Sequence, residues 1–148
     1  MRRKILVVFA SLLVVVGVSL GWIACLPGDA DVEPSQPDLV PVRNGADVNY
    51  CNVDDQNRLV VCVKNQGGAD APASTTRVEF KWGGTESQTV DLPTPLIIPH
   101  NTECIPTNVE FPMGCFDPDC GFTITVDYGN AITESNETNN SADGLCLG

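Results

Sequence analysis

The chain of 148 residues has few basic side chains, few aromatic rings and almost no histidine. It carries 8 Lys and Arg against 19 Asp and Glu, a formal net charge of −11, and three of the bases stand together at residues 2–4. An acidic chain of this kind is repelled by phosphate backbones, which argues against nucleic acid as a partner. The single histidine, His100, excludes histidine-rich metal centres and disfavours a hydrolase built on a histidine general base.

Short catalytic motifs are also missing. The sequence contains no Gly-x-Ser-x-Gly elbow, no His-Glu-x-x-His pair and no phosphate-binding loop. Asp54 and Asp55 are neighbouring carboxylates, but they stand among Asn, Gln and Arg rather than in the apolar setting that raises a carboxyl pKa. The sequence therefore predicts a protein that is not an enzyme.

An uncharged apolar run extends from Ile5 to Leu26, behind the basic cluster and ahead of acidic, proline-rich sequence. This order is typical of an export signal. The run also reaches the roughly 20 residues that a membrane-spanning helix needs. Cys25 follows Ala24 in a segment similar to a bacterial lipobox, so three alternatives stay open: lipid attached to Cys25, a retained membrane helix, or simple cleavage.

All three alternatives place the rest of the chain outside the cytoplasm, either secreted or anchored at the cell surface. Residues 1–25 are thus expected to form the signal peptide or membrane anchor. Residues 26–36 hold several prolines and acidic side chains, so we expect an extended spacer there. Residues 37–148 remain for a single folded domain.

Six cysteines follow Cys25, and an extracytoplasmic location favours disulfide bonds between them. They are Cys51, Cys62, Cys104, Cys115, Cys120 and Cys146. Many pairings of six cysteines are possible. Cys115 and Cys120 flank a turn with a central proline, which favours a bond between these two. A zinc site is less favoured, because the other four cysteines stand far apart in the sequence.

Short stretches of alternating apolar and polar residues, separated by turn residues, fill the domain. No long helical period interrupts them. The expected strands are residues 38–42, 57–65, 75–82, 86–92, 102–105 with the sequence around 109 and 111, 121–128, and 140–147. Seven short strands are the content of an all-β, immunoglobulin-like β-sandwich.

Three segments, Pro37–Val40, Val63–Gly67 and Val126–Asn140, together resemble the CARDB family, whose name stands for cell-adhesion-related domain found in bacteria. The resemblance covers roughly residues 37–147, and the Glu-Ser-Asn-Glu-Thr-Asn-Asn run near its end is the most specific element. It implies a seven-stranded immunoglobulin-like sandwich, an adhesive or structural role in surface or secreted bacterial proteins, and no shared catalytic residues.

The strand order implied by the resemblance also places Cys62 beside Cys104, and it leaves Cys51 and Cys146 near the two ends of the domain. These two pairings are the expected disulfides. Cys62 alternates with Val61 and Val63, so its bond is expected to cross the outer face of a sheet.

Oxygen-bearing side chains are dense in the last motif segment: Asp127, Asn130, Glu134, Glu137 and Asn139. Such groups are the hard ligands that Ca²⁺ prefers, which makes calcium the candidate cofactor, although their spacing is not that of an EF-hand. The alternative is a polar hairpin whose side chains hydrogen-bond to their own backbone.

Two further groups of residues have structural explanations. Asn65 and Gln66 precede two glycines at a strand end, where the amide of the Asn is expected to bind loop backbone. Phe80, Trp82 and Tyr128 are candidates for an aromatic platform, but core packing is expected for Phe80 and Trp82.

These features together predict a non-catalytic, disulfide-bonded module of binding or structural type, tethered to the bacterial cell surface by a membrane helix or a lipid. Its candidate partners are a cell-surface protein or a polysaccharide. A calcium-binding structural module and a small secreted enzyme or enzyme inhibitor are the alternatives.

Overall fold

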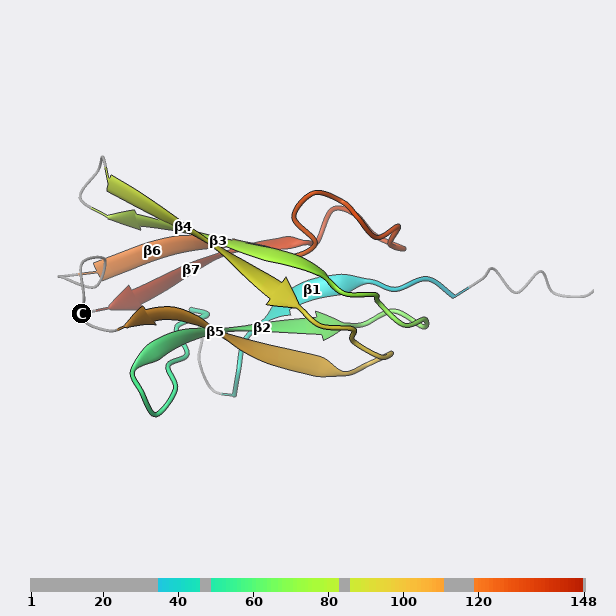
Figure 1. Ribbon diagram of the computed structural model, residues 1–148, viewed down its shortest axis with the longest axis horizontal. Helices are drawn as coiled ribbons and strands as arrows, with labels where there is room; N and C mark the ends of the chain where they lie inside the picture. The colour runs from blue at the N-terminus through green and yellow to red at the C-terminus, as the bar shows by residue number, and fades with distance from the viewer. Residues whose placement is uncertain (1–34, 46–48, 83–85, 111–118, 148) are drawn as a thin grey trace, which may run out of the picture. The chain divides into compact units, whose positions relative to one another are not determined.

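The computed structural model describes residues 35–45, 49–82, 86–110 and 119–147, in which all regular structure is β-strand. The seven strands are β1 (Leu39–Val42), β2 (Arg58–Asn65), β3 (Ser74–Trp82), β4 (Glu86–Thr94), β5 (Thr102–Glu110), β6 (Asp119–Thr125) and β7 (Ser141–Leu147) (Figure 1). Within these ranges no helix is long and apolar enough to cross a membrane. The expected signal or anchor, residues 1–25, lies outside the described residues, as do most of the spacer and Cys115.

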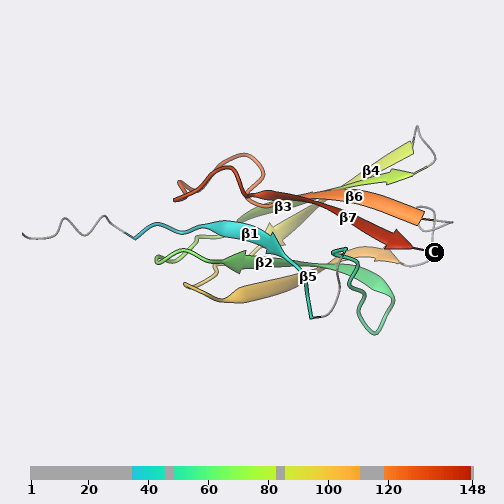
Figure 2. The same cartoon turned by 180° about the vertical axis from the view of Figure 1, so that it is seen from behind.

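The strands form two antiparallel sheets, with the order β1-β2-β5 in one and β4-β3-β6-β7 in the other. Figures 1 and 2 show the two sheets as separate layers that face each other. The predicted all-β fold with seven strands is therefore confirmed. β4 pairs with β3 and lies in the larger sheet, whereas the fourth strand of a constant-type immunoglobulin domain lies in the sheet of the first two strands.

Strict alternation in the sequence explains which side chains fill the space between the sheets. In β3 the side chains of Thr76, Val78 and Phe80 are fully buried. The residues between them point away from the core, as expected from the period of two in a strand. Core side chains from the smaller sheet include Leu59, Val61 and Val63 of β2, as predicted. Each such side chain contributes roughly 1.5–3 kcal/mol by leaving water.

One predicted strand is too long. The sequence suggested that the sixth strand runs to Tyr128, but β6 ends at Thr125. Asp127 has a positive φ of 43°, which no β-strand accepts, and the Tyr128 N–H donates to the Thr75 carbonyl instead of continuing the β6–β7 ladder. The buried Val126 continues the apolar alternation past the point where the backbone turns.

Two disulfide bonds join described residues, Cys62–Cys104 and Cys51–Cys146, and these are the two pairs that the resemblance implied. Cys62 and Cys104 are direct register partners on β2 and β5. Their bond lies on the outer face, because the core cluster contains Val61 and Val63 but not Cys62.

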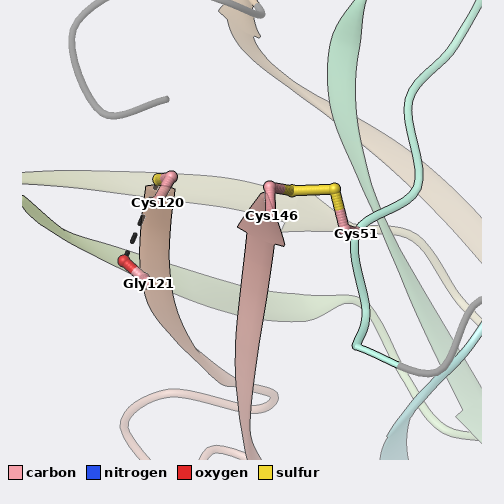
Figure 3. The surroundings of a disulfide bond; sticks show 4 residues. All are labelled: Cys51, Cys120, Gly121 and Cys146. Atoms are coloured by element: carbon pink, nitrogen blue, oxygen red, sulfur yellow. Dashed lines mark hydrogen bonds between the residues drawn. A yellow bond between two sulfur atoms is a disulfide. The ribbon is translucent and has the colours of Figure 1, made fainter. Parts of the chain in front are cut away.

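Cys51–Cys146 has a different place in the fold. It joins the segment before β2 to the end of β7 (Figure 3). Cys146 is fully buried in the core. Cys120, the register partner of Cys146 on β6, is also disulfide-bonded. The predicted pairing of Cys120 with Cys115 lies outside the described residues, since Cys115 is not among them.

Candidate functional site

The three motif segments meet at one end of the sandwich. The start of β1, the connection from β2 to β3 and the connection from β6 to β7 lie together there (Figures 1 and 2). We call residues 126–140 the β6–β7 loop. Side chains of six residues join the three segments by hydrogen bonds and form what we call the polar network: Asp38, Asn65, Gln66, Glu134, Asn139 and Asn140.

Asn65 is the most completely bonded member of the network. Its side chain is fully buried, and Oδ1 accepts from the backbone N–H groups of Asp38 at 3.1 Å and Gly67 at 3.0 Å. Its Nδ2 donates to the carbonyls of Ala69 at 2.7 Å and Ile97 at 2.9 Å. The Asn65 amide thus supplies hydrogen-bond partners to backbone groups of three loops, which is the role expected for a buried Asn at a strand end.

Asp38, directly before β1, links distant parts of the chain. Its Oδ1 accepts from Asn139 Nδ2 at 2.8 Å, and its Oδ2 accepts from Gln66 Nε2 at 3.0 Å and Ser135 Oγ at 3.3 Å. Asp38 is buried, and the donors that bind its carboxylate in the described part of the chain are all neutral. Sequence reasoning gave Asp38 no role, because its partners Ser135 and Asn139 stand about a hundred residues away.

Glu134 fastens β1 to the β6–β7 loop. Its Oε2 accepts from the Leu39 N–H at 2.5 Å, and its Oε1 accepts from Asn140 Nδ2 at 3.0 Å. The side chain is only 5% exposed. Burial raises the pKa of Glu134 to about 6, and the nearby negative charges of Glu137 and Asp127 push it in the same direction.

Asp127 holds the turn at the start of the β6–β7 loop. It is 1% exposed, its Oδ2 accepts from the Ile132 N–H at 2.9 Å, and its Oδ1 has no partner among the described residues. Its carbonyl accepts from the Asn130 N–H at 2.9 Å. Asn130 itself is exposed and also has a positive φ, of 50°.

An open hollow of about 540 Å³ lies against this loop. Asp127, Tyr128, Glu137 and Asn140 are among the residues that line it. Tyr128 is 46% exposed. Of the three aromatic candidates only Tyr128 is therefore seen at the surface, since Phe80 is buried and the side chain of Trp82 lies outside the described part of the structure.

The Tyr128 ring is held from one side by a cation. The guanidinium of Arg77 lies 3.6 Å from the ring centroid, and it also binds the Asp91 carboxylate through two hydrogen bonds of 2.7 and 2.8 Å. These bonds hold the pKa of Asp91 below its ordinary value and that of Arg77 above it. Cation–π contact and ion pair together fix the ring beside the hollow.

The five predicted calcium ligands do not form a single set of free oxygens. Glu134 uses both of its oxygens on donors of the chain, and Asn139 donates its amide to Asp38. Glu137 accepts from the Glu134 N–H at 2.9 Å. In the described ranges no group of three or more His, Cys, Asp or Glu residues is placed to hold a metal ion.

The remaining polar candidates lie elsewhere. His100 is exposed in a turn with a φ of 65°. Asp54 forms an ion pair of 2.6 Å with Arg58, and this hydrogen-bonded contact lowers the pKa of Asp54. A carboxyl group that acts as a general acid needs a raised pKa, so the pKa shift of Asp54 is opposite to the one that this role requires.

Comparison with known proteins gives the family. Comparison with curated protein sequences found no match. Among solved structures, the chain is similar to the CARDB domain of a Pyrococcus furiosus protein, solved in complex with di-metal ions, at 26% identity and a TM-score of 0.46, covering 76% of this chain and 93% of that one.

A domain of a Methanosarcina acetivorans protein, which is named provisionally as a cell surface protein, is also similar. The identity is 25% and the TM-score 0.48, and the match covers 76% of this chain and 91% of that one. The model of the CARDB family matches residues 36–143, which include strands β1 to β6 in full and the start of β7. The chain therefore belongs to the CARDB family.

Proposed function

We propose that this domain is a non-catalytic module of binding or structural type that works outside the cytoplasm, at the cell surface. The observation that carries the proposal is the pair of disulfide bonds, Cys51–Cys146 and Cys62–Cys104. Disulfides form and persist in oxidising compartments and are rare in the cytosol. The N-terminal order of basic, apolar and acidic sequence supports the same location.

The polar network supports a scaffold role for this end of the domain. Asn65 and Glu134 bind backbone groups, and the other four members bind side chains, so the network holds the loops in place. Loops positioned by a rigid sandwich are the usual binding elements of such folds. The β6–β7 loop, with the exposed Tyr128 and the hollow beside it, is thus the best supported surface for a cell-surface protein or polysaccharide.

The attachment to the cell surface rests on sequence. A retained apolar helix or a lipid on Cys25 would each keep the domain beside a membrane, with residues 26–36 as a short spacer. The acidic character of the whole chain, with a net charge of −11, makes nucleic acid a poor partner.

A labelling experiment on intact cells tests the location. A membrane-impermeant amine reagent, applied after the outer envelope is made permeable, should modify the exposed Lys81 while a cytoplasmic reference protein stays unmodified. Mass spectrometry of the same sample reports whether Cys25 carries a lipid. Labelling of Lys81 only after the cells are lysed would contradict the proposed location.

A further inference from the structure

The sequence contains two matches to the Asn-x-Ser/Thr pattern of N-linked glycosylation, both near the end of the β6–β7 loop. They are Asn136–Thr138, which reads Asn-Glu-Thr, and Asn139–Ser141, which reads Asn-Asn-Ser. Neither has the central proline that blocks modification. A match alone does not identify an acceptor, because the asparagine must also lie at the surface of an exported chain. The two asparagines differ in this respect.

Asn136 presents its amide to solvent. Asn136 and Thr138 are both exposed. Oδ1 of Asn136 accepts from the Thr138 N–H at 3.1 Å and from the Thr138 hydroxyl at 2.7 Å. Oδ1 accepts both of the hydrogen bonds that this side chain makes within the described residues, so Nδ2 stays available for another group. Donation to Oδ1 draws electron density from the amide, which makes a proton on Nδ2 easier to remove.

The residues on either side hold Asn136 in this position. The Ser135 N–H donates to the Pro37 carbonyl at 2.9 Å, and the Glu134 N–H donates to Oε1 of Glu137 at 2.9 Å. Asn136 thus lies on a loop that is fixed to the start of the domain, in the manner of other functional residues that a rigid scaffold positions at its surface.

Asn139 is in the opposite situation. It is half-buried, its Oδ1 is buried, and its Nδ2 donates to Oδ1 of the buried Asp38 at 2.8 Å. The hydroxyl of its pattern, on Ser141, donates to the Ile124 carbonyl at 3.0 Å. A sugar on Nδ2 of Asn139 would have to displace Asp38 or lie within the polar network. The folded domain therefore has no room for a glycan there.

We propose that Asn136 is the acceptor of an N-linked glycan and that Asn139 is not. The donor is a glycosyl diphosphate. Nδ2 of Asn136 loses a proton and forms a bond to the anomeric carbon of the sugar, while the bond from that carbon to the phosphate oxygen breaks and the diphosphate leaves with the electron pair. The inference rests on the proposed location outside the cytoplasm, because glycans of this kind belong to secreted and surface proteins.

Peptide mass spectrometry of the full chain from its native cells, digested without reduction, tests the proposal. Electron-transfer fragmentation, which leaves a sugar attached, should place the added mass on Asn136 and show Asn139 bare. A bare Asn136, or a sugar on Asn139, would overturn the proposal. The same digest reports on the location: reduced Cys51 and Cys146 would contradict it, whereas an intact disulfide with a bare Asn136 would refute the glycan alone.

Variants with matched shapes assign the acceptor. Asn136→Asp keeps an oxygen for the Thr138 donors but lacks the amide nitrogen, so it should fold and lose the added mass. Thr138→Val should lose it too, whereas Thr138→Ser keeps the hydroxyl and should retain it. Ser141→Ala disrupts only the second pattern and should leave the mass unchanged. Added mass that persists in Asn136→Asp or in Thr138→Val would overturn the proposal.

Discussion

Asn65 shows how much of this fold depends on one amide. It binds two N–H groups and two carbonyls from four different residues, all at the end where the motif segments meet. Asn65→Ala would leave these four groups without their partner in the interior. We expect the free energy of unfolding to fall by about 2–4 kcal/mol, measured by urea denaturation.

Asn65→Asp is the matched comparison. It keeps the acceptor for the N–H groups of Asp38 and Gly67 but loses the donor to Ala69 and Ile97, and it buries a charge. We expect it to be destabilised as well. Wild-type stability in both variants would show that water replaces the amide and that the network is not structural.

Glu134 gives the protein a predictable response to pH. Its pKa is about 6 in the folded state against an ordinary value of 4.5, so the folded chain binds this proton more tightly than the unfolded chain. The free energy of unfolding should therefore rise as the pH falls from about 7.5 to 4.5, by at most about 2 kcal/mol. Below that range Asp54 and Asp91, whose pKa values are lowered, lose their ion pairs and reverse the trend.

Glu134→Gln separates this effect from the titration of other groups. Gln keeps one acceptor oxygen for either Leu39 or Asn140 and has no proton to gain in this range. The variant should be less stable near neutral pH, and its unfolding free energy should no longer rise between pH 7.5 and 4.5. An unchanged rise in the variant would assign the pH dependence to another group.

At the scale of strands, close packing against a glycine fixes how β6 meets β7. Gly144 is the register partner of Phe122, and a Cβ at Gly144 would collide with the Phe122 ring. Phe122 is itself packed against Phe80, with ring centroids 5.9 Å apart. Gly144→Ala should therefore destabilise the domain by about 1–3 kcal/mol, seen as a lower Tm.

A second glycine substitution provides the comparison. Gly129 has a positive φ of 108° but open space where a Cβ would lie, so Gly129→Ala strains the backbone without a collision. We expect a smaller loss of stability in this variant. A Gly144→Ala protein as stable as the wild type would show that Phe122 does not lie over β7.

Strand positions followed from the sequence wherever the period of two decides burial. β3 is the clearest case, because Thr76, Val78 and Phe80 alternate with charged residues and are all buried. The end of β6 did not follow, since the turn depends on a positive φ at Asp127, which the apolar pattern of Phe122, Ile124 and Val126 does not reveal. Alternation shows which face of the sheet a side chain occupies, but it does not show where the strand ends.

The candidate site was less predictable than the strands. Local amide patterns pointed to Asn65, whose partners include nearby loop residues. Asp38 and Glu134 bind groups that are far away in the sequence. Their roles therefore become visible only in the folded structure, where β1 lies against the β6–β7 loop. The unpaired oxygens of Asp127 and Asn140 depend on the same tertiary contacts.

At the scale of the whole molecule, the two disulfides should differ in their effect on stability. Cys51–Cys146 spans 95 residues and ends in the core, whereas Cys62–Cys104 spans 42 residues and joins strands that are already paired. The larger loop loses more entropy when it is closed in the unfolded chain. Replacing Cys51 and Cys146 by Ala should lower Tm more than replacing Cys62 and Cys104. The reverse order in melting curves would contradict this assignment.

Disulfide mapping of the native protein, alkylated at once on cell lysis and digested without reduction, is the decisive measurement for the covalent frame of the sandwich. We expect one linked peptide pair joining Cys51 to Cys146 and another joining Cys62 to Cys104. Alkylated, unlinked Cys51, Cys62, Cys104 and Cys146 in the native protein would contradict both the covalent frame of the sandwich and its proposed place outside the cytoplasm.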